Sequence, residues 1–396
     1  MNNFDDKLNE IIKFISKSDK KTIKNKLHNI LKYNKFCPIV LGSGSAGKAY
    51  IPESKNIEVN INNKKVYLPV VVKEANNLTD ELDIMIDIVG NKLYIIGINN
   101  GIASEAIILM YIKQLYKKTV HLPLILGYGT CLETTKINKI ITIRHGLDND
   151  IEVDLTGKVY EKNKKHKSYI TTFADLFNYI YFSKNKDGSV ILPNGIKCDN
   201  ISELYDYICI SYLATYHLLT KNKIYPRDIY EENIFIHWLN DTSYYNNESI
   251  KDCKNIIYKV KNKYYKIKTF GFVIILGDCG KFLVEAKKDI MIIGSGHVDK
   301  KMKNPLKMAL LDAKRINMDI IIRCYDMLTM NEFKNSIAYN ILNSYPNNIY
   351  PLSSLWKMWN RPITKNLSTP ELLDFYYKKY GIDKYTKDKE TILIKT

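Results

Sequence analysis

Arginine is scarce in this sequence, and its scarcity decides how the charge is interpreted. Of the 59 basic residues, 54 are lysine and five are arginine, and the formal net charge is +17. The planar guanidinium of arginine reads bases and grips phosphates bidentately, whereas lysine meets a phosphate as a point charge. A charge carried by lysine indicates a solvated surface more than a nucleic-acid face. The sequence therefore argues against nucleic acid as a specific partner.

Cysteine motifs and long apolar runs are absent as well. The seven cysteines lie between Cys37 and Cys324 without a Cys-x-x-Cys and without clustered histidines. This pattern predicts neither a zinc site nor a disulfide framework. No apolar run approaches the roughly 20 residues of a membrane helix, and no basic start followed by an apolar core opens the chain. We expect an intracellular, cytoplasmic protein with no membrane span.

What the sequence does contain is a change of texture along its length. With 396 residues the chain exceeds the usual size of one core. The pattern predicts an amphipathic helix at 3–33, a strand-rich part from 38, a loop-like stretch at 74–101 and a polar linker at 149–168. Helices dominate the prediction beyond the linker. We expect an α+β fold in which a ligand cleft separates a β-rich part from an α-rich part.

Periodicity predicts the individual elements. Strands are predicted at 38–41, in a hairpin at 57–72 that turns at Asn62-Asn63, and at 122–128, 140–144, 256–260 and 272–276. Helices are predicted at 102–116, 173–182, 201–220 and 316–328.

The first stretch that could carry chemistry is Gly42-Ser43-Gly44-Ser45-Ala46-Gly47-Lys48, a glycine-rich turn between strand-like runs. Glycines at such a turn let backbone N–H groups approach phosphate oxygens that a Cβ would keep away. The stretch also fits the Gly-x-x-x-x-Gly-Lys loop of P-loop nucleotidases. That loop must open a helix and needs Ser or Thr where Ala49 stands, so we favour a phosphate loop between two strands.

A lysine and a glutamate follow at the ends of predicted elements. Val70-Val71-Val72-Lys73 ends a strand, and Ser104-Glu105-Ala106 opens a helix. A glutamate on a neighbouring helix can hold a phosphate-binding lysine in place by an ion pair. Glu81 is the alternative glutamate, because the interval from Lys73 to Glu105 is long. We favour Glu105, since a helix and two predicted strands follow it.

The most specific pattern lies between a long apolar helix and an apolar strand. It reads Pro226-Arg227-Asp228-Ile229-Tyr230-Glu231-Glu232-Asn233. In phosphoryl transfer an aspartate such as Asp228 can take the proton of the acceptor hydroxyl. An amide five residues later, here that of Asn233, can bind a magnesium ion. The strand predicted at 272–276 is followed by Asp278, Cys279 and Gly280. A carboxylate at the end of this strand is a candidate ligand for a magnesium ion. Asp-x-Gly alone is also an ordinary β-turn.

These five motifs, in this order, resemble the eukaryotic-type protein kinase superfamily. The chain resembles in particular the divergent serine/threonine kinases of large DNA viruses, whose AT-rich composition it shares. The resemblance spans about residues 38–330. It implies a bilobal fold with a β-rich N-lobe and an α-helical C-lobe. The implied domains are an N-terminal helical extension at 1–35, the N-lobe at 36–147, the C-lobe at 148–345 and a C-terminal helical extension of the C-lobe at 346–396.

The resemblance also implies roles for residues. Gly42 to Gly47 and Lys73 would bind ATP, with Glu105 positioning Lys73. Asn233 and Asp278 would hold Mg²⁺, and Asp228, preceded by Arg227, would act as the catalytic base. Asp319 looks like the buried aspartate that braces the catalytic loop; a carboxylate on the helix surface is the alternative. The implied function is a serine/threonine protein kinase with protein substrates, located in a host cytoplasm or virion if the chain is viral.

Several positions depart from the family pattern. Pro226 stands in place of histidine, Tyr230 in place of lysine and Cys279 in place of phenylalanine. No Ala-Pro-Glu follows Gly280, and Ser295 is the one hydroxyl residue between Gly280 and Pro305. Activation by phosphorylation of this segment is therefore not expected. Two other functions stay open, namely a pseudokinase scaffold that binds nucleotide without transfer and a kinase-fold phosphotransferase for small molecules. An insertion at about 238–262 has no assigned role.

Overall fold

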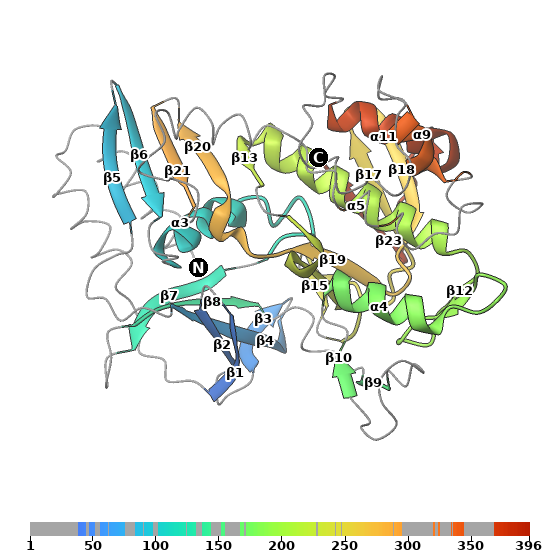
Figure 1. Ribbon diagram of the computed structural model, residues 1–396, viewed down its shortest axis with the longest axis horizontal. Helices are drawn as coiled ribbons and strands as arrows, with labels where there is room; N and C mark the ends of the chain where they lie inside the picture. The colour runs from blue at the N-terminus through green and yellow to red at the C-terminus, as the bar shows by residue number, and fades with distance from the viewer. Residues whose placement is uncertain are drawn as a thin grey trace.

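The computed structural model describes a defined part of the chain. It covers residues 39–44, 47–51, 56–61, 63–75, 84–89, 91–97, 102–123, 125–131, 137–143, 152–154, 167–169, 172–226, 229–241, 243–246, 248–287, 289–294, 320, 324, 334, 336–343 and 368–396. The helix expected at 3–33 lies outside these residues. Within them the protein is an α+β structure with several small sheets (Figure 1).

The elements of the first part of the chain are mostly strands. They are β1 (Ile39–Gly44), β2 (Gly47–Ile51), β3 (Asn56–Ile61), β4 (Lys64–Ala75), β5 (Ile84–Val89), β6 (Lys92–Gly97), helix α3 (Ile102–Lys113), β7 (Ile125–Cys131), β8 (Ile137–Ile143), β9 (Glu152–Asp154) and β10 (Lys167–Tyr169). The linker predicted at 149–168 thus contributes to an antiparallel pair, β9 with β10.

The second part of the chain alternates helices with short strands. It contains α4 (Phe173–Ser183), β11 (Val190–Ile191), β12 (Lys197–Cys198), α5 (Ile201–Lys221), β13 (Ile224–Tyr225), the 3-10 turn η1 (Glu231–Asn233), β14 (Ile234–Trp238), β15 (Tyr244–Tyr245), β16 (Glu248–Ser249), β17 (Asn255–Val260), β18 (Lys263–Lys268), β19 (Phe272–Leu276), η2 (Cys279–Lys281), β20 (Leu283–Lys287), β21 (Ile290–Ile293), α9 (Ile337–Asn343), α11 (Thr369–Tyr380), β22 (Gly381–Ile382) and β23 (Thr391–Lys395). The described residues of this part contain both helices and strands, and a mainly α-helical second part stays a prediction.

Many of the predicted elements are confirmed. The helices predicted at 102–116, 173–182 and 201–220 are α3, α4 and α5, and the strands predicted at 256–260 and 272–276 are β17 and β19. The hairpin at 57–72 is β3 with β4, and Asn63 in its turn has a φ of 62°, which asparagine tolerates better than most residues. In the helix predicted at 316–328, Ile320 and Cys324 are helical and buried. Asp319 lies outside the described residues.

The stretch at 74–101 is the clearest correction. Instead of a loop it contains the antiparallel hairpin β5 and β6, which joins a five-stranded sheet in the order β13-β20-β21-β6-β5. Both faces of β6 are buried, so its residues are apolar without the alternation of a half-exposed strand. Acidic residues lie just before the hairpin in the sequence, and they also favoured the prediction of a loop.

Two other sheets frame the molecule. One is six-stranded, with the path β1-β2-β4-β8-β7 and β3 paired to β4. The other has the order β22-β18-β17-β23 and combines the insertion predicted at 238–262 with the strands that follow α11. In Figure 1 the six-stranded sheet lies at the lower left, whereas β17 and β18 of the four-stranded sheet lie next to α11 at the upper right.

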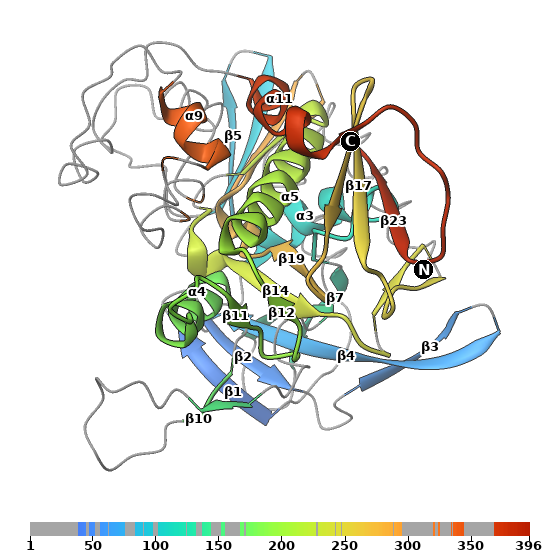
Figure 2. The same cartoon turned by 90° about the vertical axis from the view of Figure 1, so that its right-hand side faces the viewer.

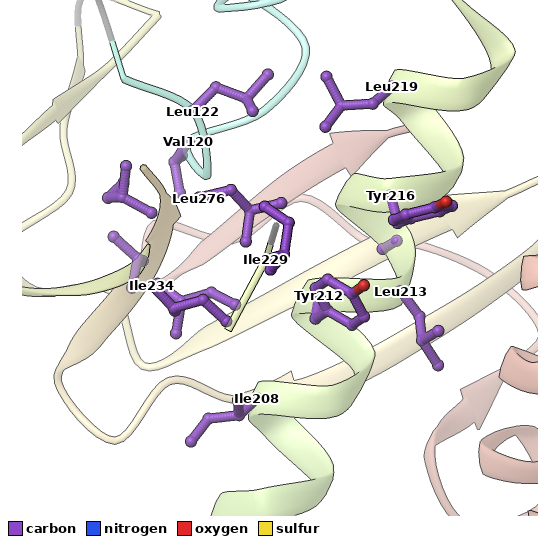
Figure 3. Close-up of a cluster of buried hydrophobic side chains, with 14 of the residues drawn as sticks. Val120, Leu122, Ile208, Tyr212, Leu213, Tyr216, Leu219, Ile229, Ile234 and Leu276 are labelled. Atoms are coloured by element: carbon purple, nitrogen blue, oxygen red, sulfur yellow. The ribbon is translucent and has the colours of Figure 1, made fainter. Parts of the chain in front are cut away.

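Helix α5 forms the centre of the main core. Its side chains are buried almost all round from Leu204 to Leu219, as expected of a helix that is apolar on every face. Figure 3 shows Tyr212 and Tyr216 of this helix near Ile229, Ile234 and Leu276, with Val120 and Leu122 from the segment after α3 close by. No helix in the described part of the chain is long and apolar enough to cross a membrane.

Candidate functional site

The glycine-rich turn lies next to the strand that carries Lys73. Gly44 pairs with Gly47 across the β1–β2 hairpin, and Ala49 of β2 pairs with Lys73 of β4. Adjacent strands lie about 4.8 Å apart, so the turn and Lys73 belong to neighbouring backbones. Residues 47–51 form a strand and not a helix, which excludes the P-loop alternative. Ser45 and Ala46 lie outside the described residues.

Asn233 and Asp278 lie at the same end of one β-ribbon. Strand β14 begins directly after Asn233, and β19 ends two residues before Asp278, and the two strands pair antiparallel with Ile234 opposite Leu276. The Gly277 N–H donates to the Asn233 carbonyl at 2.8 Å and closes this end. A Cβ at Gly277 would overlap the ring of Phe235, so only glycine fits here. The ribbon thus brings together the two predicted magnesium ligands.

Asp278 has an unusual backbone conformation. Its φ is 44° and its ψ 62°, in the left-handed region that few non-glycine residues occupy. Such conformations cost of order 1–3 kcal/mol and persist where the surrounding structure imposes them. Here β19 arrives with every residue from Phe272 to Leu276 buried, and η2 begins immediately afterwards. The conformation of Asp278 marks this turn as a candidate functional position.

Glu105 reaches the same turn from helix α3. It lies in the first helical turn and is 6% exposed. A Cβ built on Gly280 would be 3.3 Å from Glu105 Oε2 and 3.4 Å from Asp278 Oδ1, so both carboxylates border one small region. Two carboxylates this close attract a cation, either a lysine ammonium or a divalent metal ion. The structure therefore brings Glu105 to Asp278, while the alternative residue Glu81 lies outside the described residues.

Arg227 and Asp228, which the sequence predicts to form a catalytic loop, lie outside the described residues as well. The chain on either side of them is well anchored. Strand β13 precedes them and pairs with β20, and Ile229 directly after them is buried, followed by η1 and Asn233. The segment thus begins at the five-stranded sheet and ends at the ribbon that carries Asn233 and Asp278.

A buried polar network, which the sequence did not reveal, supports β19 from behind. His121, from the segment after α3, has Nδ1 2.7 Å from the Ile274 carbonyl and Nε2 2.7 Å from the Tyr258 hydroxyl. The Tyr258 hydroxyl is 2.7 Å from the Ser211 hydroxyl of α5, and the Leu276 N–H donates to the His121 carbonyl. A single histidine among seven gave no signal of this role.

Burial decides the protonation state of His121. Desolvation lowers its pKa to about 4, against a partly opposing contribution from the Ile274 carbonyl. The ring is therefore neutral at pH 7. Because a carbonyl can only accept, Nδ1 carries the proton and donates it to Ile274, and Nε2 accepts from Tyr258. His121 is thus a structural brace for the strand that leads to Asp278.

No protein-family model matches this chain, and no curated protein matches it. Among the residues that the structure describes, no group of three or more His, Cys, Asp or Glu side chains could hold a metal ion.

Proposed function

We propose that the protein is an ATP-dependent phosphotransferase of the protein-kinase type, with a bilobal fold and with serine or threonine hydroxyls of proteins as acceptors. Its cofactors in this proposal are ATP and Mg²⁺. The proposal rests on the order of the sequence motifs together with one structural observation. Asn233, Asp278 and Glu105, from three separate segments of the chain, converge on one turn.

This convergence favours phosphoryl transfer over an ordinary structural turn. A β-turn with Asp-x-Gly needs neither a second carboxylate from a distant helix nor a backbone hydrogen bond to an asparagine at the start of a paired strand. Carboxylate and amide oxygens are ligands that Mg²⁺ accepts, and it usually keeps several water molecules and substrate oxygens beside them. A site with Asn233 and Asp278 as its protein ligands is consistent with this coordination.

Each residue then has a defined task. Asn233 and Asp278 would hold Mg²⁺, which supplies positive charge to the phosphate oxygens when bound. Lys73, beside the glycine-rich turn, would contact the phosphates, and Glu105 would hold the Lys73 ammonium in place. Asp228 would orient the acceptor hydroxyl and take its proton, with Arg227 directly before it. The backbone N–H groups of residues 42–47 would cover the phosphates.

The experiment compares three aspartate variants. Asp228→Asn is expected to lower phosphate transfer from labelled ATP by about 10²–10⁴-fold and to leave the thermal shift caused by Mg·ATP nearly intact. Asp278→Asn is expected to lose both transfer and the Mg²⁺-dependent shift. Asp241→Asn is the matched control, because Asp241 is an exposed surface carboxylate paired with Lys251.

The outcomes separate the proposed function from its alternatives. Undiminished transfer by Asp228→Asn would contradict the assignment of the base. A wild-type protein that is stabilised by Mg·ATP but transfers no phosphate would be a scaffold. Transfer to small alcohols without transfer to any protein would indicate a small-molecule phosphotransferase.

A further inference from the structure

The five-stranded sheet joins three segments that flank the candidate site. Strand β13 comes just before Arg227 and Asp228, strands β20 and β21 follow the Asp278 turn, and β5 with β6 form the hairpin at 84–97 that precedes α3. We call β5 and β6 the 84–97 hairpin. Its strand β6 pairs in parallel with β21, from Leu93 opposite Ile290 to Ile96 opposite Ile293. Figure 1 shows these strands side by side, with α3 next to them.

The contact between the 84–97 hairpin and β21 is extensive for so short a pairing. On one face of the sheet Leu93, Ile95 and Ile292 belong to the main core. On the other face Tyr94, Ile96, Met291 and Ile293 form a second buried cluster with Leu283. The Leu93 N–H also donates to the Asp289 carbonyl at 2.7 Å. Burial on both faces, added to the backbone hydrogen bonds, holds β21 firmly to the hairpin.

The far end of β21 rests directly on the candidate site. The Gly294 N–H donates to the Phe282 carbonyl at 2.8 Å. A Cβ at Gly294 would overlap the carbonyl oxygen of Gly280, so the two backbones are in contact. Gly280 in turn borders the carboxylates of Glu105 and Asp278. Movement of β21 would therefore displace the turn at which these carboxylates meet.

We propose that the 84–97 hairpin is a built-in positioning element, which keeps residues 279–294 paired and thereby keeps Glu105 and Asp278 together without any modification of that segment. This inference rests on the proposed function. A phosphate group can order such a segment by pairing with basic side chains. Here strand pairing does the same, and the sequence offers only Ser295 as a hydroxyl between Gly280 and Pro305. The hairpin thus makes the site active as synthesised.

The first test asks whether activity needs a covalent phosphate. The full-length protein is treated with a broad-specificity phosphatase, its unmodified mass is verified, and transfer from labelled ATP is measured. The proposal expects the treated protein to retain the untreated rate. A loss of transfer on phosphatase treatment, restored by preincubation with Mg·ATP, would overturn it.

The second test perturbs the pairing itself. Gly294→Ala forces β21 and Gly280 apart, and a displacement of about 1 Å at reacting groups can lower kcat/KM by about 10²-fold. Ile95→Ala removes a buried side chain opposite Ile292 and should lower the rate of transfer. Ile95→Val keeps most of this contact and should transfer phosphate at the wild-type rate. Ile88→Ala is the matched control, because Ile88 lies in the same hairpin and its side chain is 46% exposed.

Two readouts distinguish positioning from stability. The Mg²⁺ concentration for half-maximal transfer should rise in Gly294→Ala and stay unchanged in Ile88→Ala, at a temperature where both are folded by circular dichroism. Amide hydrogen exchange should show protection of 283–293 in the wild type and its loss in Ile95→Ala. An exchange pattern or a Mg²⁺ requirement that these variants leave unchanged would overturn the proposal. If the wild type transfers no phosphate at all, the proposed function fails, and the exchange experiment still decides whether the hairpin orders the segment.

Discussion

Two sheets of this protein are assembled in the same way and serve different parts of it. In the five-stranded sheet, the hairpin at 84–97 joins strands from residues 224–225 and 283–293. In the four-stranded sheet, the hairpin at 255–268 joins strands from residues 381–382 and 391–395. Each sheet contains one parallel pair between distant segments, β6 with β21 in the first and β17 with β23 in the second.

The difference lies in what each sheet contacts. The five-stranded sheet ends at Gly294, in contact with the turn of Asp278 and Glu105. The four-stranded sheet contacts α11, and Figure 2 shows its strands β17 and β23 next to each other. Its Tyr258 hydroxyl lies 2.7 Å from both Ser211 of α5 and His121, whose ring contacts the backbone of β19. In our proposal the first sheet positions the catalytic groups, whereas the second stabilises the core on which they stand. Substitutions should separate the two roles.

The largest effect on stability is expected from Tyr258→Ala in the second sheet. Tyr258 is fully buried and its hydroxyl lies 2.7 Å from both His121 and Ser211. Loss of a buried aromatic ring costs about 3–5 kcal/mol of unfolding free energy. Urea unfolding measures the cost, with Tyr264→Ala as the control, because Tyr264 is only partly buried on β18. Tyr258→Ala should leave phosphate transfer per folded molecule nearly unchanged. If it lowered transfer as much as Gly294→Ala does, the two sheets would not have the separate roles that we propose.

A somewhat smaller effect is expected from the protonation of His121 in acid. The pKa of His121 is lowered from 6.5 to about 4 by burial, so between these pH values the unfolded chain binds a proton that the folded chain does not. Stability is therefore full above pH 6.5 and decreases as the pH falls toward 4, by about 3 kcal/mol at most from this residue.

Urea unfolding at several pH values between 7 and 4 tests this expectation. His237, whose pKa burial also lowers to about 4, should add a similar slope. In His121→Gln the slope should decrease by the share of His121 and leave that of His237. An unchanged pH dependence in this variant would show that His121 is not neutral in the folded protein.

The smallest effect is expected at the contact between the helices α11 and α5. Lys379 of α11 is 3.1 Å from the buried carboxylate of Asp206 in α5. Burial raises the pKa of Asp206, while the Tyr380 hydroxyl and Lys379 lower it. Because the Lys379 side chain is 41% exposed, Lys379→Ala should cost no more than about 1 kcal/mol. Lys378→Ala, at an exposed position of the same helix, should cost nothing measurable in the same unfolding experiment. A cost above that of Tyr258→Ala would refute the ranking.

Local sequence patterns predicted two kinds of element. One kind buries a single face, and the other has turn-forming or capping residues at its ends. Helix α4 and strand β19 have the predicted bounds to within a residue, because their apolar periodicity and flanking turn residues are local signals. The hairpin of β3 and β4 was visible from Asn62-Asn63 for the same reason. The hairpin at 84–97 was missed, although Gly90-Asn91 is a turn signal, because β6 is buried on both faces and its residues do not alternate.

For the candidate site, too, the sequence determined some features and the tertiary structure others. Residue type and order along the chain singled out Lys73, Glu105, Asn233 and Asp278, since each motif is a short local pattern. The sequence also determined that basic charge here is mostly lysine background. Only the tertiary structure decided that Glu105 and Asp278 border the same glycine, that His121 braces β19, and that two distant hairpins complete two sheets. These facts depend on contacts between residues more than a hundred positions apart, and such pairing is fixed by packing and backbone hydrogen bonds in the folded chain, which no local pattern records.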